Sequence, residues 1–139
     1  MPPIHAKSIR ELLSYIDKNI SADESLLFIP DGAFINFMTD IDMKLYDYQS
    51  LMPPYVEVFG IDKIIADIKK EKFDNIVLAP RSSVEYNGSY SICKPLDSKM
   101  LDDYTQRKEE KMLCDYIRSN YNFAGIIGTG YIFEIYKRK

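Results

Sequence analysis

Two short apolar segments, each ending in a proline, restrict the folds open to this chain more than any other feature. They are residues 25–30 (SLLFIP) and residues 75–80 (NIVLAP). Neither segment alternates between apolar and polar residues, which predicts strands that are covered on both faces. Between them, after Gly60, isoleucines recur at helical spacing at Ile61, Ile64, Ile65 and Ile68. A strand, a helix and a second strand in this order predict parallel pairing through a right-handed crossover.

Two further helices and a hairpin complete the expected fold. Residues 8–11 fit a capping box and apolar residues follow at helical spacing, so a helix is expected over residues 8–20. Residues 101–119 predict another helix, with its best apolar stripe at Met112, Leu113, Tyr116 and Ile117. Residues 123–127 and 131–136, joined by glycines, predict a terminal hairpin. We therefore expect one α/β domain over residues 1–139, a small three-layer, mostly parallel, Rossmann-like sheet with a C-terminal antiparallel hairpin.

Three segments between these elements remain. Asp31-Gly32 is expected to cap a short helix that runs to Met38. Residues 40–58 are irregular, with a possible short strand at residues 43–46, and residues 81–99 form a second long, polar connection. Loops of this length are often functional or mobile.

Composition excludes several classes of function. A net charge of -3 and a sequence pI near 5.2 argue against nucleic-acid binding, which needs a concentrated basic face. The dense basic run at the end, Lys137-Arg138-Lys139, is expected to be a solvated chain end. No window approaches the ~18 apolar residues of a membrane span, so the chain as it stands is expected to be soluble.

Residue types that carry catalysis are scarce. The single histidine, His5, precedes the first expected helix, which excludes most hydrolase designs. Cys93 and Cys114 match neither a C-x-x-C motif nor a zinc site, so two buried or half-exposed thiols are expected. The close carboxylates at residues 40–42 and 102–103 lack further metal ligands. Residues 125–130 lack the G-x-G-x-x-G order of a nucleotide-binding loop. We expect no catalytic residue, no metal site and no cofactor in this chain.

A candidate ligand-binding surface follows from the two apolar strands. Each ends in a proline and then a polar residue, and the carboxyl ends of parallel strands form the ligand crevice in open α/β sheets. The expected binding residues are Asp31, Asn36, Arg81 and Glu85, flanked by Tyr46, Tyr48, Tyr86 and Tyr90. Structural roles are open alternatives, with Asp31 as a helix cap and Arg81 with Glu85 as a surface ion pair. The tyrosines could pack the loops down or could stack on a sugar or a partner.

Several short motifs resemble one protein family. Residues 29–39 (IPDGAFINFMT) are similar to the soluble C-terminal region of bacterial multi-pass membrane glycosyltransferases, the group like dolichyl-phosphate-mannose protein mannosyltransferases. The likeness continues at residues 51–54, at residues 74–78, at Arg81 with Glu85-Tyr86, and at residues 115–121, and it spans about residues 8–137. An arginine expected soon after the short helix is absent, since the stretch reads Asp40-Ile41-Asp42-Met43-Lys44.

The resemblance implies a function outside catalysis. In such proteins acidic residues in loops of the membrane portion carry out transfer, so this chain is expected to be a non-catalytic accessory domain, a fragment of a longer membrane protein on the extracytoplasmic face of a bacterial membrane. Its expected partners are the membrane domain of the same parent chain and a carbohydrate or protein acceptor, with no nucleic acid. The alternative is a free-standing small-molecule-binding or methyltransferase-like Rossmann module. That alternative needs a glycine-rich first turn, where Asp31-Gly32 supplies a single glycine.

Overall fold

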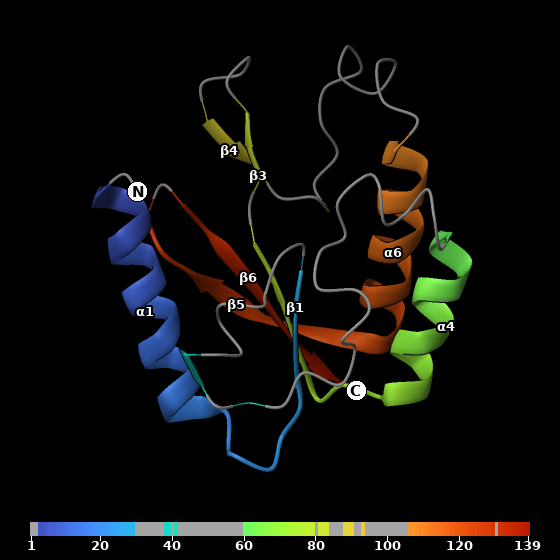
Figure 1. Ribbon diagram of the computed structural model, residues 1–139, viewed down its shortest axis with the longest axis horizontal. Coiled ribbons are helices and arrows are strands. Elements are labelled where there is room, and N and C mark those ends of the chain that lie inside the picture. Colours follow the sequence, from blue (N-terminus) through green and yellow to red (C-terminus); the bar gives the residue numbers. More distant parts are fainter. Residues whose placement is uncertain are drawn as a thin grey trace.

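The fold is a four-stranded sheet with helices on both faces (Figure 1). The computed structural model describes residues 3–29, 38–39, 41, 60–79, 81–83, 88–90, 93, 106–129 and 131–139. Its elements are α1 (Pro3–Asn19), β1 (Leu26–Ile29), α4 (Ile61–Glu71), β2 (Asn75–Leu78), β3 (Arg81–Ser83), β4 (Gly88–Tyr90), α6 (Gln106–Asn120), β5 (Tyr121–Ile127) and β6 (Phe133–Arg138).

The sheet is mixed, with the order β1-β2-β6-β5. β1 and β2 pair in parallel, from Leu26 opposite Asn75 to Ile29 opposite Leu78, which confirms the expected pairing of the two apolar segments. β6 is antiparallel to β2, and β5 is antiparallel to β6. The expectation of a mostly parallel sheet is therefore wrong for the described strands. The terminal hairpin itself is confirmed, but its second strand inserts beside β2 instead of extending a parallel series.

Helices cover both faces of the sheet and divide the core in two. Side chains of β1 and β2 point alternately to either face, so both strands are fully buried. On one face α1 packs through Leu12 and Ile16 against β1 and β6. On the other face α4 and α6 pack through Ile64, Ile68, Leu113 and Ile117, as Figure 1 shows. The continuous apolar runs of the sequence thus correspond to strands enclosed between two helical layers.

Helix α1 begins earlier than its sequence pattern predicts. It starts at Pro3, so Ser8 lies inside the helix and not at its cap. The Ser8 side chain is 1% exposed, and its Oγ lies 3.4 Å from the carbonyl oxygen of Thr129 in the turn between β5 and β6. His5 also lies within α1, and its ring packs on Tyr131 at 4.3 Å between centroids. The expected positions of His5 and Ser8 are both corrected, because contacts with the hairpin extend the helix beyond the local capping signal.

The helix between the apolar strands has the bounds that its isoleucines indicate. α4 follows Gly60, whose φ of 79° is accessible to glycine without a steric penalty, and it buries Ile61, Ile64 and Ile68. The helix ends at Lys72, a left-handed residue whose amide donates to the carbonyl of Ile68. β2 then begins three residues later.

A disulfide joins Cys93 to Cys114, which corrects the expectation of two thiols. Both cysteines are buried, and Cys114 lies on the inner side of α6 beside Leu113 and Ile117. A spacing of 21 residues matches no local motif, so the pairing depends on how the fold brings residue 93 against α6. Met112, expected in the apolar stripe, is exposed. Residues 101–105 of the expected helix lie outside the described residues.

Candidate functional site

The structure places two of the eight candidate ligand-binding residues. Arg81 lies in β3 and Tyr90 in β4, and the two are directly opposite each other in a short antiparallel pair. This pair lies within residues 81–99, which were expected to form a long, polar connection, so part of that connection is a short antiparallel pair of strands. The other six candidates lie outside the described residues: Asp31, Asn36, Tyr46, Tyr48, Glu85 and Tyr86. The short helix expected after Asp31, the irregular segment at residues 42–58 and the possible strand at residues 43–46 also lie outside them, except for helical Met38 and Thr39.

A buried carboxylate that sequence reasoning missed lies at the carboxyl end of β2. Glu134 of β6 is opposite Leu78, the last residue of β2. It is 8% exposed, and its Oε2 accepts a hydrogen bond of 3.2 Å from the hydroxyl of Tyr136. Glutamate side chains are almost never fully buried in proteins unless they are paired. Glu134 is therefore the strongest single indication of a functional surface in the described part of the chain.

Tyr136 is always the donor of its hydrogen bond with Glu134. Burial and, to a smaller extent, the neighbouring Glu134 carboxylate raise the pKa of Tyr136 to about 12, although Arg118 partly offsets both effects. The phenol consequently keeps its proton at any physiological pH. The hydrogen bond then always runs from Tyr136 to Glu134, which leaves the carboxylate as an acceptor.

Arg118 connects this pair to the disulfide. It lies near the end of α6, and its guanidinium donates to the carbonyl oxygen of Cys93. Because Cys93 is bonded to Cys114 of the same helix, the carbonyl that Arg118 binds is held in place covalently. The positive charge of Arg118 also lowers the pKa of the Tyr136 phenol, which partly offsets the effect of burial. A guanidinium offers five N–H donors, so several remain for other groups.

Two exposed apolar side chains lie on the same face of the sheet as Glu134. Ile126 of β5 is directly opposite Glu134, and the ring of Phe123 contacts Tyr136 edge to face at 5.5 Å. Phe123 and Ile126 are each 60% exposed. We call the five residues Arg118, Phe123, Ile126, Glu134 and Tyr136 the Glu134 surface. It combines acceptor, donors and an aromatic ring within one small area.

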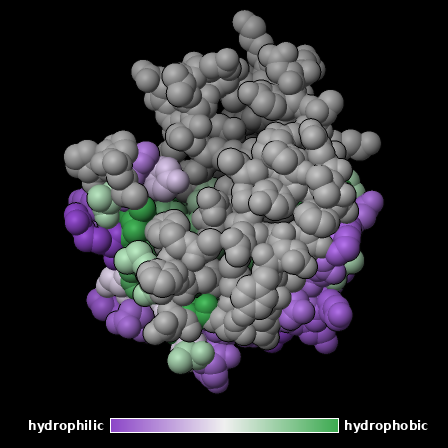
Figure 2. Space-filling view, viewed as in Figure 1, coloured by the Kyte–Doolittle hydropathy of each residue, from purple (hydrophilic) through white to green (hydrophobic). Residues whose placement is uncertain are grey.

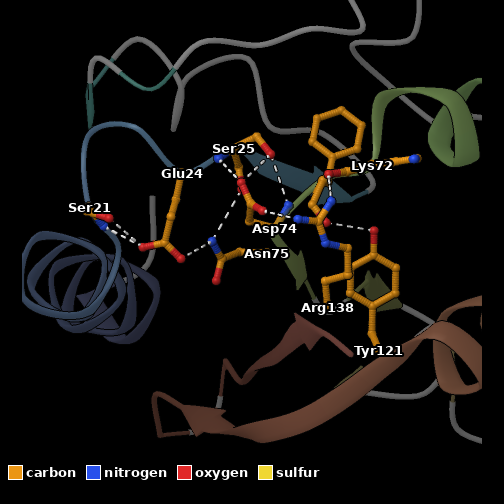
Figure 3. Close-up of polar contacts among 9 residues, drawn as sticks. Ser21, Glu24, Ser25, Lys72, Asp74, Asn75, Tyr121 and Arg138 are labelled. Carbon is orange, nitrogen blue, oxygen red and sulfur yellow. Dashed lines mark hydrogen bonds and ion pairs between the residues drawn. The ribbon is translucent and has the colours of Figure 1, made fainter.

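The opposite end of the sheet carries a second polar cluster, shown in Figure 3. Ser25 precedes β1 and Asp74 precedes β2, and the two residues bond reciprocally. The amide and the hydroxyl of Ser25 donate to Asp74 Oδ2 at 2.9 and 3.0 Å, and the amide of Asp74 donates to Ser25 Oγ at 2.9 Å. The pair lies at the start of the parallel strands β1 and β2, next to the backbone bond from the amide of Asn75 to the carbonyl of Ser25.

Arg138 extends this cluster to the last strand. Its Nη2 lies 2.8 Å from Asp74 Oδ1, and its Nη1 donates to the carbonyl oxygen of Lys72 at 2.6 Å. Its amide donates to the carbonyl of Asp74. The amide of Lys139 donates to the carbonyl of Asn120. The expectation of a solvated chain end is therefore wrong for the main chain, because Lys137 and Arg138 belong to central strand β6.

The remaining members of the cluster face α1. The amide and the hydroxyl of Ser21 both donate to the carboxylate of Glu24. These two bonds, the amide bond more than the hydroxyl bond, lower the pKa of the Glu24 carboxyl. Asn75 is fully buried and donates to Glu24 and to the carbonyl of Ser25, while its own Oδ1 has no partner among the described residues. On the other side of the sheet, the hydroxyl of buried Tyr121 donates to the carbonyl of Phe73 at 2.9 Å. Apart from the local bonds between Ser21 and Glu24, these bonds tie one chain segment to another, so we assign the cluster a structural role.

The outer surface of the described helices gives no further site. Figure 2 shows hydrophilic side chains over the outer sides of α1 and α4. Within the described ranges, no three histidine, cysteine or acidic side chains lie together as metal ligands would. Among the helices described, none has the length and apolar character needed to cross a membrane. Comparisons with protein-family models, with curated proteins and with solved structures found no match.

Proposed function

We propose that this chain is a non-catalytic accessory domain of a membrane glycosyltransferase-like protein and that it lies on the extracytoplasmic face of a bacterial membrane. The observation that carries the proposal is the disulfide between Cys93 and Cys114. Disulfides persist in oxidising compartments and are rare in the cytosol, where thiols are kept reduced. Both cysteines are buried, so the bond is shielded from reductants in the folded state.

The resemblance in the sequence supplies the rest of the proposal. Its principal motif begins at Ile29, the last residue of the buried strand β1, and a second part, residues 74–78, covers Asp74 and strand β2. In the family it resembles, acidic residues in loops of the membrane portion carry out transfer. The proposed partners are therefore the membrane domain of the same parent chain and a carbohydrate or protein acceptor.

The size and location of the native protein test this proposal. An antibody raised against the chain should detect, in membranes of the native host, a protein much larger than the 16.2 kDa of this chain. A species of this mass in the soluble fraction would contradict it and would favour the free-standing small-molecule-binding module. The reading frame upstream of Met1 gives the same test at the level of the gene, since membrane spans are expected there.

Thiol labelling tests the compartment separately. Cells are lysed in the presence of an alkylating reagent, with and without prior reduction and denaturation, and the protein is analysed by mass spectrometry. Cys93 and Cys114 should be modified only after reduction. Modification of both residues without reduction would show that they are thiols in the cell, and it would remove the support for an extracytoplasmic location.

A further inference from the structure

We infer that the Glu134 surface is a binding site for a neutral saccharide. The inference goes beyond the accessory role proposed above, because it depends only on described side chains and holds whether or not the chain is joined to a membrane domain. It begins from the burial of Glu134. A carboxylate that is 8% exposed in a central strand loses most of its hydration. A single neutral hydrogen bond, from Tyr136, replaces only part of that hydration.

The packing of strand β6 does not require a carboxylate at Glu134. Strand β6 is otherwise held by Phe133 and Ile135 on the α1 face and by Tyr136 on the α6 face. No ion pair within 4.0 Å joins Glu134 to Arg118 or to any other described cation. Among the described residues Oε1 of Glu134 accepts no hydrogen bond, whereas Oε2 is paired with Tyr136. An apolar residue would serve the core at this position as well.

The charges around the surface select the class of ligand. Glu134 repels phosphates and carboxylates. The guanidinium of Arg118, which donates to the carbonyl oxygen of Cys93 and acts by charge on Tyr136, repels ammonium groups. A ligand that satisfies both residues needs hydroxyl groups, which donate to a carboxylate and accept from a guanidinium. A neutral polyhydroxyl compound meets both needs without burying an unpaired charge.

The exposed apolar residues indicate which kind of polyhydroxyl compound fits the Glu134 surface. Phe123 presents a ring that is 60% exposed beside Tyr136, and Ile126 is equally exposed opposite Glu134. An open-chain polyol has no flat apolar face, whereas the ring of a saccharide has C–H groups on one face and hydroxyls at its rim. The C–H face would pack on Phe123 while rim hydroxyls bond Glu134 and Arg118. Aromatic side chains are suited to such contacts because they lose little entropy on binding.

NMR titration of the isotope-labelled chain tests the inference. The probes are the methyl glycosides of mannose, glucose and N-acetylglucosamine, with glycerol as a hydroxyl-bearing control that lacks a ring. We expect at least one glycoside to shift the amide signals of Phe123, Ile126 and Glu134, and glycerol to leave them unchanged. Absence of shifts with all three glycosides, or shifts confined to another surface, would overturn the inference.

Variants make the test specific to the surface. Phe123→Ala should weaken glycoside binding about tenfold, and Phe123→Tyr should restore it because the ring is kept. Glu134→Gln keeps the shape and one acceptor but removes the charge, and it should also weaken binding. Met112→Ala removes an exposed apolar side chain of α6 that lies outside the surface, and it should change nothing. Equal binding by the Phe123→Ala and Met112→Ala proteins, both folded by circular dichroism, would refute the site.

Discussion

At the residue scale, the Asp74 side chain joins two distant chain segments in the cluster of Figure 3, through Ser25 and Arg138. It accepts two hydrogen bonds from Ser25, which is 6% exposed, and it pairs with the more exposed Arg138. Exposed ion pairs contribute little to stability, whereas leaving a buried donor without a partner is costly. The bond of Asp74 with Ser25 should therefore stabilise the fold more than its bond with Arg138.

Double-mutant cycles measure this difference. Asp74→Ala should lower the free energy of unfolding by about 2 kcal/mol, and Arg138→Ala by less than about 1 kcal/mol. From urea denaturation, the coupling energy of Ser25 with Asp74 should exceed that of Arg138 with Asp74. The exposed pair Lys111 and Asp115, 2.8 Å apart on α6, is the matched control and should couple by at most about 0.5 kcal/mol. A larger coupling for Arg138 than for Ser25 would contradict the assignment.

Tyr121 gives the fold a defined response to alkaline pH. Burial and, to a smaller extent, the neighbouring Tyr116 raise its pKa from 10.0 to about 12. The unfolded chain therefore releases this proton at lower pH than the folded chain does. Stability from this group is complete below pH 10 and is lost as the pH rises from 10.0 towards about 12.

Replacing Tyr121 by phenylalanine tests the sign of this response. Above about pH 10.5 the free energy of unfolding of the wild type should fall more steeply than that of Tyr121→Phe, by about 1.4 kcal/mol per pH unit. At neutral pH the variant should lose about 1 kcal/mol, since the bond to the carbonyl of Phe73 is absent. Urea denaturation across the pH range checks both values. Parallel pH profiles for the two proteins would show that Tyr121 titrates normally in the folded state.

At the scale of elements, the turn between β5 and β6 determines how the hairpin meets α1. Gly128 has a φ of 102°, and a Cβ atom at this position would lie 2.3 Å from the carbonyl oxygen of Tyr131 and 2.9 Å from Ser8 Oγ. Gly60, before α4, also has a positive φ, of 79°, but a Cβ there would meet nothing within 4 Å. The two glycines share a conformational requirement and differ in steric surroundings.

Alanine substitutions at these two glycines separate the two effects. Gly60→Ala should cost about 1 kcal/mol, the penalty of a left-handed backbone with a side chain. Gly128→Ala carries a similar penalty and in addition forces the turn away from Ser8 and Tyr131, so we expect a loss of about 3 kcal/mol or more. Thermal and urea denaturation give the comparison. Equal losses of stability in the two variants would mean that the turn moves freely relative to α1.

At the scale of the whole molecule, the sequence predicts the interior of the fold better than its connectivity. The uninterrupted apolar runs at Leu26 and at Ile76 identify the two parallel strands, because enclosure between helices requires apolar residues on both faces. The direction of β6 could not be predicted, since a hairpin can dock with either strand inward. The bond between Cys93 and Cys114 likewise depends on tertiary contact, which a spacing of 21 residues does not encode.

The burial of Glu134 in the candidate site likewise could not be predicted from the sequence. The order Phe133-Glu134-Ile135-Tyr136 alternates as a strand with one solvated face does, which places Glu134 in water. In the structure β6 is a central strand of the sheet, and Glu134 is 8% exposed. The sequence signal used to predict a site, a polar residue after each apolar strand, points to the carboxyl end of β2, where Arg81 follows and Glu134 is opposite Leu78. It could not reveal that the buried carboxylate comes from the end of the chain.

The position of strands in the sheet predicts which parts open first. β2 and β6 each have a neighbour on both sides, so their amides should exchange with solvent only through global unfolding. β3 and β4 have three residues each and form a sheet of two strands, an arrangement with little stability of its own.

Hydrogen exchange followed by NMR tests this difference between the two sheets. The opening free energies of the Val77 and Ile135 amides should equal the free energy of unfolding from denaturant titration, and those of Ser82 and Ser89 should be clearly lower. Equal protection in the two sheets would mean that β3 and β4 unfold together with the core. Lower protection would instead leave Arg81 and Tyr90 on a segment that rearranges at small cost, as ligand-binding segments commonly do.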